Sequence, residues 1–234
     1  DFTALSTAQL GAISSKAFPA LETEDIAALS TTQVAALSTK QIVSMETADI
    51  AALTTAQTIS LPTAAIAALS TGQITAIETA DIAALTTAQI NALKSAQIAA
   101  LTSTQFAALT SIQITALSTA SIAGLTTAQV ASLATDTVAA LSTAQVAALS
   151  TAAIAALTTD QVTAFTTTQL GALTSKQVAA LETADLAALS SSQVAAFSTS
   201  AMAALSSAQI MALEPEDFTA LSTAQLGAIS SKAF

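Results

Sequence analysis

Residues 141–148 read Leu-Ser-Thr-Ala-Gln-Val-Ala-Ala, and units of this form fill the chain. A large apolar residue (Leu, Ile, Met or Phe) recurs at every eighth position from Leu5 to Ile229, which defines 29 octads. We letter the positions of each octad a to h, so that Leu141 is a and Ala148 is h. An internal repeat of fixed period is typical of a solenoid, in which each unit packs on its neighbours.

Each octad position follows its own rule. Position f is Ile, Val, Leu, Phe or Met except at Thr58, and position h is always Ala, Ser or Gly. Position c is Ser or Thr except at Pro215, and position e is usually Gln and sometimes Asp. Positions d and g vary freely. These rules indicate that a and f face a core, and that d and g face outward.

The same rules favour a helix over a strand. On a strand, f and the next a are three residues apart and would point to opposite faces, as would d and g. On a helix that advances about 100° per residue from c, f lies near about 300° and a near about 240°, which makes one apolar face. Positions g and d then share the opposite face. The helix accounts for both pairs of positions.

The helix must break once in every octad. A continuous helix would turn about 800° per octad, so its apolar stripe would circle the helix within about five octads. Residues 30–33, Ser-Thr-Thr-Gln, show the capping-box pattern of a new helix start, and Pro62 and Pro215 lie at b and c, where a helix begins but does not continue. We therefore predict a helix of about seven residues from c to a, then a corner near b; helices this short need neighbours for stability.

The predicted architecture is an all-α solenoid that runs through residues 1–234 as one continuous domain. Residues 1–18 recur unchanged as residues 217–234. This duplication indicates either a super-repeat, of which residues 1–216 are one copy, in a longer parent or a chain closed on itself by engineering. Phe2, Phe18, Phe218 and Phe234 fall in the duplicated segment, and we expect a contact between super-repeats there. The sequence leaves the number of octads per turn open.

Composition excludes several classes of function. The 234 residues include no His, Cys, Trp or Tyr, and only 9% are charged. These absences remove the usual bases, thiols and zinc ligands, so we expect no enzyme, no catalytic residue and no cofactor. The net charge of −10 disfavours nucleic acid as a partner. Uninterrupted apolar runs reach six residues, as in 64–69, far below the roughly 20 that a transmembrane helix needs.

Five octads carry an acidic pair, with Glu at b and Asp at e. Three interpretations stay open: helix-start acids that interact with the helix dipole, a charge contact between filaments, or a calcium site. Two carboxylates supply few of the six to eight oxygens that calcium prefers. The pairs are Glu22 and Asp25, Glu46 and Asp49, Glu78 and Asp81, Glu182 and Asp185, and Glu214 and Asp217.

Hydroxyl and amide side chains form two further columns. We expect Ser and Thr at b and c to cap helices, with ice binding and O-glycosylation as alternatives. Gln at e is predicted to form either a cap or corner hydrogen bond or a ladder along the fibre, and the sequence does not separate these two.

Octads of the form Leu-Thr-Thr-Ala-Gln-Val/Ile-x-Ala, found along the whole chain, resemble the octapeptide repeats of very large bacterial surface and biofilm-matrix proteins. Those proteins carry loose labels such as adhesin or haem-utilisation protein. The residues do not support haem binding, because Met45, Met202 and Met211 have no His, Cys or Tyr as a partner ligand. A shorter likeness to the helix opening of TAL effectors reflects a shared capping habit.

The resemblance and the repeat together predict a structural, self-assembling protein at the cell surface or outside the cell. The expected partner is the protein itself, in a fibre, a matrix filament or an adhesin stalk. The alternative is a surface-binding module, either ice-binding or glycan-bearing, that does not polymerise. Calcium or a glycan is a further candidate partner.

Overall fold

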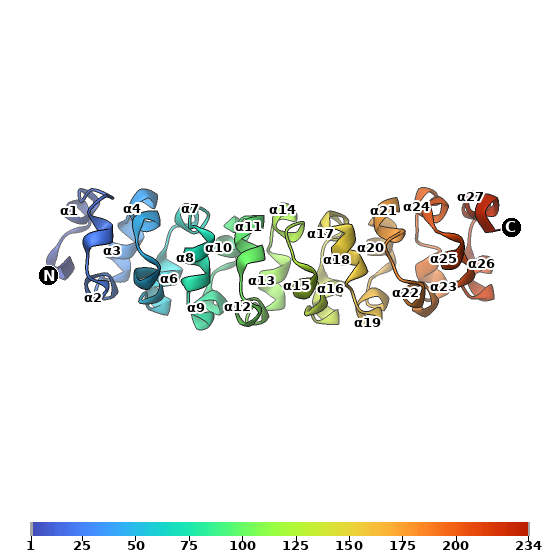
Figure 1. Ribbon diagram of the computed structural model, residues 1–234, viewed down its shortest axis with the longest axis horizontal. Coiled ribbons are helices and arrows are strands. Elements are labelled where there is room, and N and C mark those ends of the chain that lie inside the picture. Colours follow the sequence, from blue (N-terminus) through green and yellow to red (C-terminus); the bar gives the residue numbers. More distant parts are fainter. Residues whose placement is uncertain (1, 234) are drawn as a thin grey trace. The chain divides into compact units, whose positions relative to one another are not determined.

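The computed structural model describes residues 2–233, and the side chains of residues 3–229. All regular structure in this part of the chain is helical, with a short helix in almost every octad (Figure 1). The predicted all-α solenoid is confirmed. None of the described helices is both long enough and apolar enough to cross a bilayer. The predicted contact between phenylalanines falls partly outside these residues, because Phe234 and the Phe2 side chain are not among them.

By the contacts among its residues, the chain divides into two compact units, and the division in the sequence falls between Ser121 and Ile122. We describe each unit by itself. The octad pattern of the sequence continues through the border, where α14 (Thr119–Ile122) lies.

The first unit contains η1 (Phe2–Ala4), α1 (Thr7–Gly11), η2 (Phe18–Ala20), α2 (Thr23–Ala27), α3 (Thr31–Ala36), α4 (Thr39–Ser44), α5 (Thr47–Ala51), α6 (Thr55–Ser60), α7 (Thr63–Ile66), α8 (Thr71–Ala76), α9 (Thr79–Ala84), α10 (Thr87–Ala92), α11 (Ser95–Ala100), α12 (Ser103–Ala107) and α13 (Ser111–Thr115). The second unit contains α15 (Thr127–Ala131), α16 (Thr135–Ala140), α17 (Thr143–Ala148), α18 (Thr151–Ala155), α19 (Thr159–Thr163), α20 (Thr167–Ala172), α21 (Ser175–Val178), α22 (Thr183–Ala188), α23 (Ser191–Val194), α24 (Thr199–Ala204), α25 (Ser207–Met211), α26 (Pro215–Ala220) and α27 (Thr223–Ala233).

Two extended residues, a and b, form the corner between successive helices. Ser142 before α17 has φ −68° and ψ 156°, and Leu149 after it has φ −58° and ψ 137°. The Leu149 N–H donates to the Val146 carbonyl at 3.2 Å, which closes the last turn. Position a is therefore outside the helix, and the prediction of a seven-residue helix from c to a was wrong. The extended backbone at a redirects the chain while it keeps the side chain in the core.

This corner needs no glycine. Within the described residues no backbone φ is positive and no peptide bond is cis. Position b is extended with a negative φ, as at Ser142, and proline therefore fits there without strain, as at Pro62 with φ −59°. The near absence of glycine from the sequence follows from this geometry.

The pattern of one α-helix per octad is interrupted at two places. Pro19 lies at g in the second octad, where its missing N–H interrupts the α-helix and only the 3₁₀ helix η2 forms. Helix α27 runs through Ile229 and Ser230 and joins two octads, so the expected break in every octad is wrong at that point. Helix α27 packs on α24 and α25.

The core consists of positions a and f, as predicted. Val146 at f is fully buried and Leu149 at a is 4% exposed, whereas Ala144 at d is exposed. Position e is buried as well: Gln145 is only 5% exposed, although it is polar. The sequence did not predict this burial.

Each helix packs on the third helix further along the chain. In the first unit α3 contacts α6 and α7 contacts α10, and in the second unit α17 contacts α20 and α21 contacts α24. Hydrogen bonds from position e to backbone carbonyls span 28 to 31 residues. One turn of each unit therefore takes between three and four octads, a number that the sequence left open.

Two isoleucines in the first unit provide a test of this core. Ile74 at f is fully buried, whereas Ile112 at d is 70% exposed. We expect Ile74→Ala to lower the free energy of unfolding by about 2–5 kcal/mol, because it leaves a cavity. Ile112→Ala should change it by less than about 0.5 kcal/mol. Chemical denaturation followed by circular dichroism measures both, and equal losses would contradict the assignment of f to the core.

Candidate functional site

The glutamine at e is the one polar side chain that the core encloses in most octads. Its carbonyl oxygen caps its own helix: Gln177 Oε1 accepts the Thr174 N–H at 2.8 Å. In return, Thr174 Oγ1 accepts the Gln177 N–H at 3.3 Å. This reciprocal pair is a capping box, and it satisfies N–H groups that have no partner inside the helix. The predicted capping roles of Gln at e and of the hydroxyl at b are confirmed.

The amide nitrogen of the same side chain points to a different helix. Gln177 Nε2 donates to the Val146 carbonyl at 2.9 Å and to the Leu149 carbonyl at 2.8 Å. These carbonyls lie at the carboxyl end of α17, where the last backbone acceptors of a helix are not bonded by a further turn; the Val146 carbonyl also accepts the Leu149 N–H. One side chain thus caps the start of its own helix and the end of a helix four octads earlier. The two roles that the sequence could not separate are both present.

The amide-to-carbonyl contact recurs throughout both units. In the first unit the donors are Gln33, Gln41, Gln57, Gln73, Gln89, Gln97, Gln105 and Gln113. In the second unit they are Gln161, Gln169, Gln177, Gln193, Gln209 and Gln225. We call this set the glutamine ladder.

Aspartate at e makes no ladder contact, but it keeps the cap at Asp49, Asp185 and Asp217. Asp49 is 2% exposed, and its Oδ2 accepts the Glu46 N–H at 3.0 Å. A carboxylate has no proton to donate to a carbonyl. Its Oδ1 instead accepts the Thr23 hydroxyl at 3.0 Å, from position c 26 residues earlier.

The threonine contact recurs at two other acidic octads. Asp81 Oδ1 accepts the Thr55 hydroxyl at 2.5 Å, and Asp185 Oδ1 accepts the Thr159 hydroxyl at 2.9 Å. The buried hydroxyl of Thr58, the one polar residue at f, lies 3.4 Å from Asp81 Oδ2. Sequence reasoning missed these threonine donors, because Ser or Thr fills almost every c and the relevant ones look like the rest.

The two members of each acidic pair share a helix start but lie in different surroundings. Glu22, Glu46, Glu78, Glu182 and Glu214 are exposed. Asp49, Asp81, Asp185 and Asp217 are buried, and Asp25 is half-buried. Among the described residues, no group of three or more carboxylates gathers at one point. The calcium interpretation of the pairs stays a prediction, as does a charge contact through the exposed glutamates.

Most octads form one short helix, and in most of them a buried side chain at e links that helix to an octad far away in the sequence. This arrangement defines an all-helical octad-repeat solenoid. A family profile described as the ALTTAQ repeat matches six stretches, which are residues 18–45, 42–76, 74–111, 112–143, 138–175 and 178–214. The chain belongs to the ALTTAQ repeat family. A search of curated proteins finds no match.

Replacing a ladder amide with a carboxylate tests the ladder. We expect Gln177→Glu to keep the cap to Thr174 but to place a buried negative charge beside the Val146 and Leu149 carbonyls. The second unit should lose at least about 1–3 kcal/mol of stability, the cost of leaving buried polar groups unsatisfied. Thr168→Glu adds the same charge at an exposed d position and serves as the control. Hydrogen exchange of the α17 and α21 amides measures both, and a Gln177→Glu variant as stable as the control would contradict the ladder.

A double-mutant cycle tests the contact between aspartate and threonine. For Thr159→Val combined with Asp185→Ala, which removes the acceptor, we expect a coupling free energy of about 1.5–3 kcal/mol, typical of a hydrogen bond to a charged group. The control cycle pairs Asp185→Ala with Thr151→Val, an exposed threonine at c in the preceding octad. Its coupling should be close to zero. Equal coupling in the two cycles, measured by denaturant titration, would refute the assigned partner.

Proposed function

We propose that this protein is structural and self-associating: the repeat region of an extracellular fibre, a matrix filament or an adhesin stalk. The glutamine ladder carries the proposal. Every ladder octad presents an amide donor toward earlier octads and carbonyl acceptors toward later ones, so the same contact can be repeated without limit. A repeat with two complementary faces favours open-ended growth.

The chemistry of the chain supports a mechanical role over a catalytic one. The polar groups of the core are used for helix capping, and no buried side-chain nitrogen or oxygen among the described residues lacks a hydrogen-bond partner. The proposal therefore assigns no reaction to the protein. Its partner is another stretch of the same octads, and the net charge of −10 argues against nucleic acid.

The proposed location, outside the cell or at its surface, is supported by the resemblance of the octads to bacterial surface and matrix repeats. The exposed glutamate of each acidic octad gives a place where calcium or neighbouring filaments would make contact.

Self-association is tested by analytical ultracentrifugation of the purified chain over a wide range of concentrations, with electron microscopy of the same samples. We expect the weight-average mass to rise with concentration and elongated assemblies to appear. Added sodium chloride should promote assembly, because it screens the repulsion between chains that carry the same negative charge. A chain that stays a monodisperse monomer at every concentration would refute the proposal.

A second candidate function rests on the exposed hydroxyl column at c. In α17, α18 and α20 these side chains are Thr143, Thr151 and Thr167, all exposed. Such a column suits binding to an ice surface or the attachment of O-glycans. A thermal-hysteresis assay tests the first possibility, and the intact mass of protein purified from its source tests the second. Hysteresis no larger than that of an unrelated acidic protein would exclude ice binding.

A further inference from the structure

The described lysines of the first unit lie in octads that share one side of the solenoid. Lys16 and Lys40 are at d, three octads apart, and Lys94 is at b, seven octads after Lys40. Because one turn takes between three and four octads, these steps return to nearly the same side after one turn and after two more. Helix α4, which contains Lys40, contacts η2 and α7, and Gln97 of α11 donates to the Ile66 carbonyl of α7 at 2.8 Å. We call Lys16, Lys40 and Lys94 the lysine ridge.

The glutamates at b in the first unit lie in a second set of octads. Glu22, Glu46 and Glu78 are separated by three and by four octads, so they also return to one side. Helix α2 follows Glu22, and it contacts α5, which follows Glu46. Figure 1 shows α4 and α11 at the upper edge of the first unit, and α2 and α9 at its lower edge. We call these three residues the glutamate ridge.

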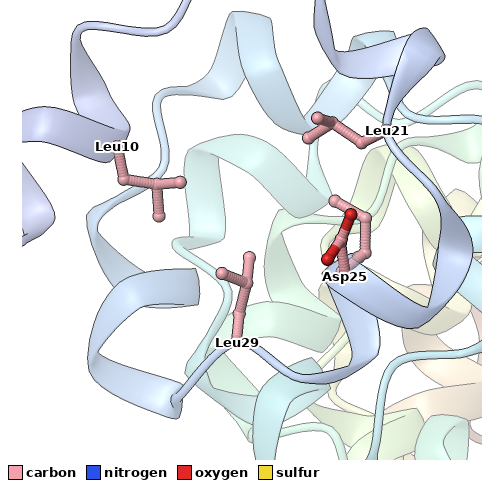
Figure 2. A pocket seen from close by; sticks show the side chains of 5 residues that line it. Leu10, Leu21, Asp25 and Leu29 are labelled. Atoms are coloured by element: carbon pink, nitrogen blue, oxygen red, sulfur yellow. The ribbon is translucent and has the colours of Figure 1, made fainter. Parts of the chain in front are cut away.

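The charged groups of both ridges are open to solvent. All six side chains are exposed, and among the described residues none of them forms an ion pair with another. The aspartates of the same octads do not belong to the glutamate ridge. Asp49 and Asp81 are buried, and Asp25 is half-buried in a pocket that Leu10 and Leu21 also line (Figure 2). The first unit thus presents two exposed surfaces of opposite charge on different sides.

The two ridges have a common spacing. Lys16 and Lys40 are 24 residues apart, and so are Glu22 and Glu46. Each of these lysines comes six residues before its glutamate, which is about a quarter of a turn. If two copies lie side by side and run in the same direction, both lysines of one copy are therefore nearly level with both glutamates of the other.

The second unit contains the same arrangement once. Lys176 and Glu182 are again six residues apart, and both are exposed. Lys94 and Glu78 lie on the ridges of the first unit but do not share this spacing, so we assign them no pair.

We propose that copies of this chain associate side by side, with the lysine ridge of one copy against the glutamate ridge of the next. This inference rests on the proposed self-association and names a lateral contact for it. The partner is a second copy rather than calcium, because calcium would account for the glutamates but not for lysines at the same spacing. The contact joins two different surfaces, so a third copy adds in the same way as the second.

Charge makes this arrangement selective. The chain has a net charge of −10, so most orientations of two copies bring like charges together. One exposed ion pair contributes only about 0.2–1 kcal/mol, so several must form at once. The common spacing meets this requirement. Complementary charges therefore fix the direction and the register of neighbouring copies.

Reversal of charges tests the lateral contact. Glu22→Lys with Glu46→Lys moves the net charge from −10 to −6, which lowers the overall repulsion between copies. Net charge alone would then strengthen self-association. The ridges require the opposite, a weakening of at least about fivefold, because lysine then meets lysine. Adding Lys16→Glu and Lys40→Glu to the same chain restores the net charge and the pairs with their signs exchanged, so association should return to within about twofold of the original.

A matched control separates the ridges from net charge. Asp136→Lys with Asp160→Lys makes the same change in net charge at exposed positions that have no lysine six residues earlier. This variant should associate at least as strongly as the unaltered chain. Sedimentation equilibrium measures all association constants at one ionic strength, because salt screens both the overall repulsion and the paired charges. Circular dichroism monitors the fold, and Lys94 shows that position b accepts a lysine at the start of a helix.

The outcomes distinguish this contact from the proposed function. If the unaltered chain self-associates and Glu22→Lys with Glu46→Lys associates equally or more strongly, the lateral contact is refuted while the proposed function stands. Failure of the variant with four substitutions to recover, or an equal loss in the control, also refutes the lateral contact alone. If the unaltered chain does not self-associate, both are refuted.

Discussion

The structure depends on one hydrogen-bonding problem, which is how to end a helix of four to six residues in most octads. A helix this short leaves most of its backbone groups without partners inside the helix. The glutamine at e solves this at both ends, since its oxygen binds the N–H of b at the start of its own helix and its nitrogen binds carbonyls at the end of another. Because these two helices are four octads apart, the hydrogen bonds that cap the helices also connect successive turns of the solenoid. The pitch of each unit is then set by the reach of one side chain.

The sequence was sufficient to predict the class of fold. The angular separation of a and f from d and g distinguished helix from strand, and the capping box located each helix start. The sequence was misleading at position a, because a helical wheel treats every residue of the apolar face as helical. Leu149 is instead extended and in the corner, yet its side chain is in the core beside Val146. Sequence reasoning also missed Pro19, whose effect depends on its place at g in its octad.

The partners of position e were beyond sequence reasoning for a different reason. Gln177 and the carbonyls of Val146 and Leu149 are 28 to 31 residues apart, and that separation follows from the pitch of the assembled solenoid. The residue pattern within one octad gives no information about the pitch of the solenoid. The frequent recurrence of glutamine beside the apolar face was the available signal, since a cap alone also accepts Ala153 or Ala201 at the same position.

The acidic octads show how the repeat tolerates change. Aspartate has no amide proton to donate, so it gives up the distant carbonyls, and in three of the five acidic octads its oxygen still binds the N–H of b. In three acidic octads an aspartate oxygen accepts a hydroxyl at c 26 residues earlier, as Asp185 accepts that of Thr159. The contact is made by threonine at Asp49, Asp81 and Asp185. In these three octads the hydroxyl at c, which looks redundant beside the cap at b, therefore gives a buried carboxylate a hydrogen-bond donor. This tolerance explains how acidic octads can be placed at several points along the chain while the winding is unchanged.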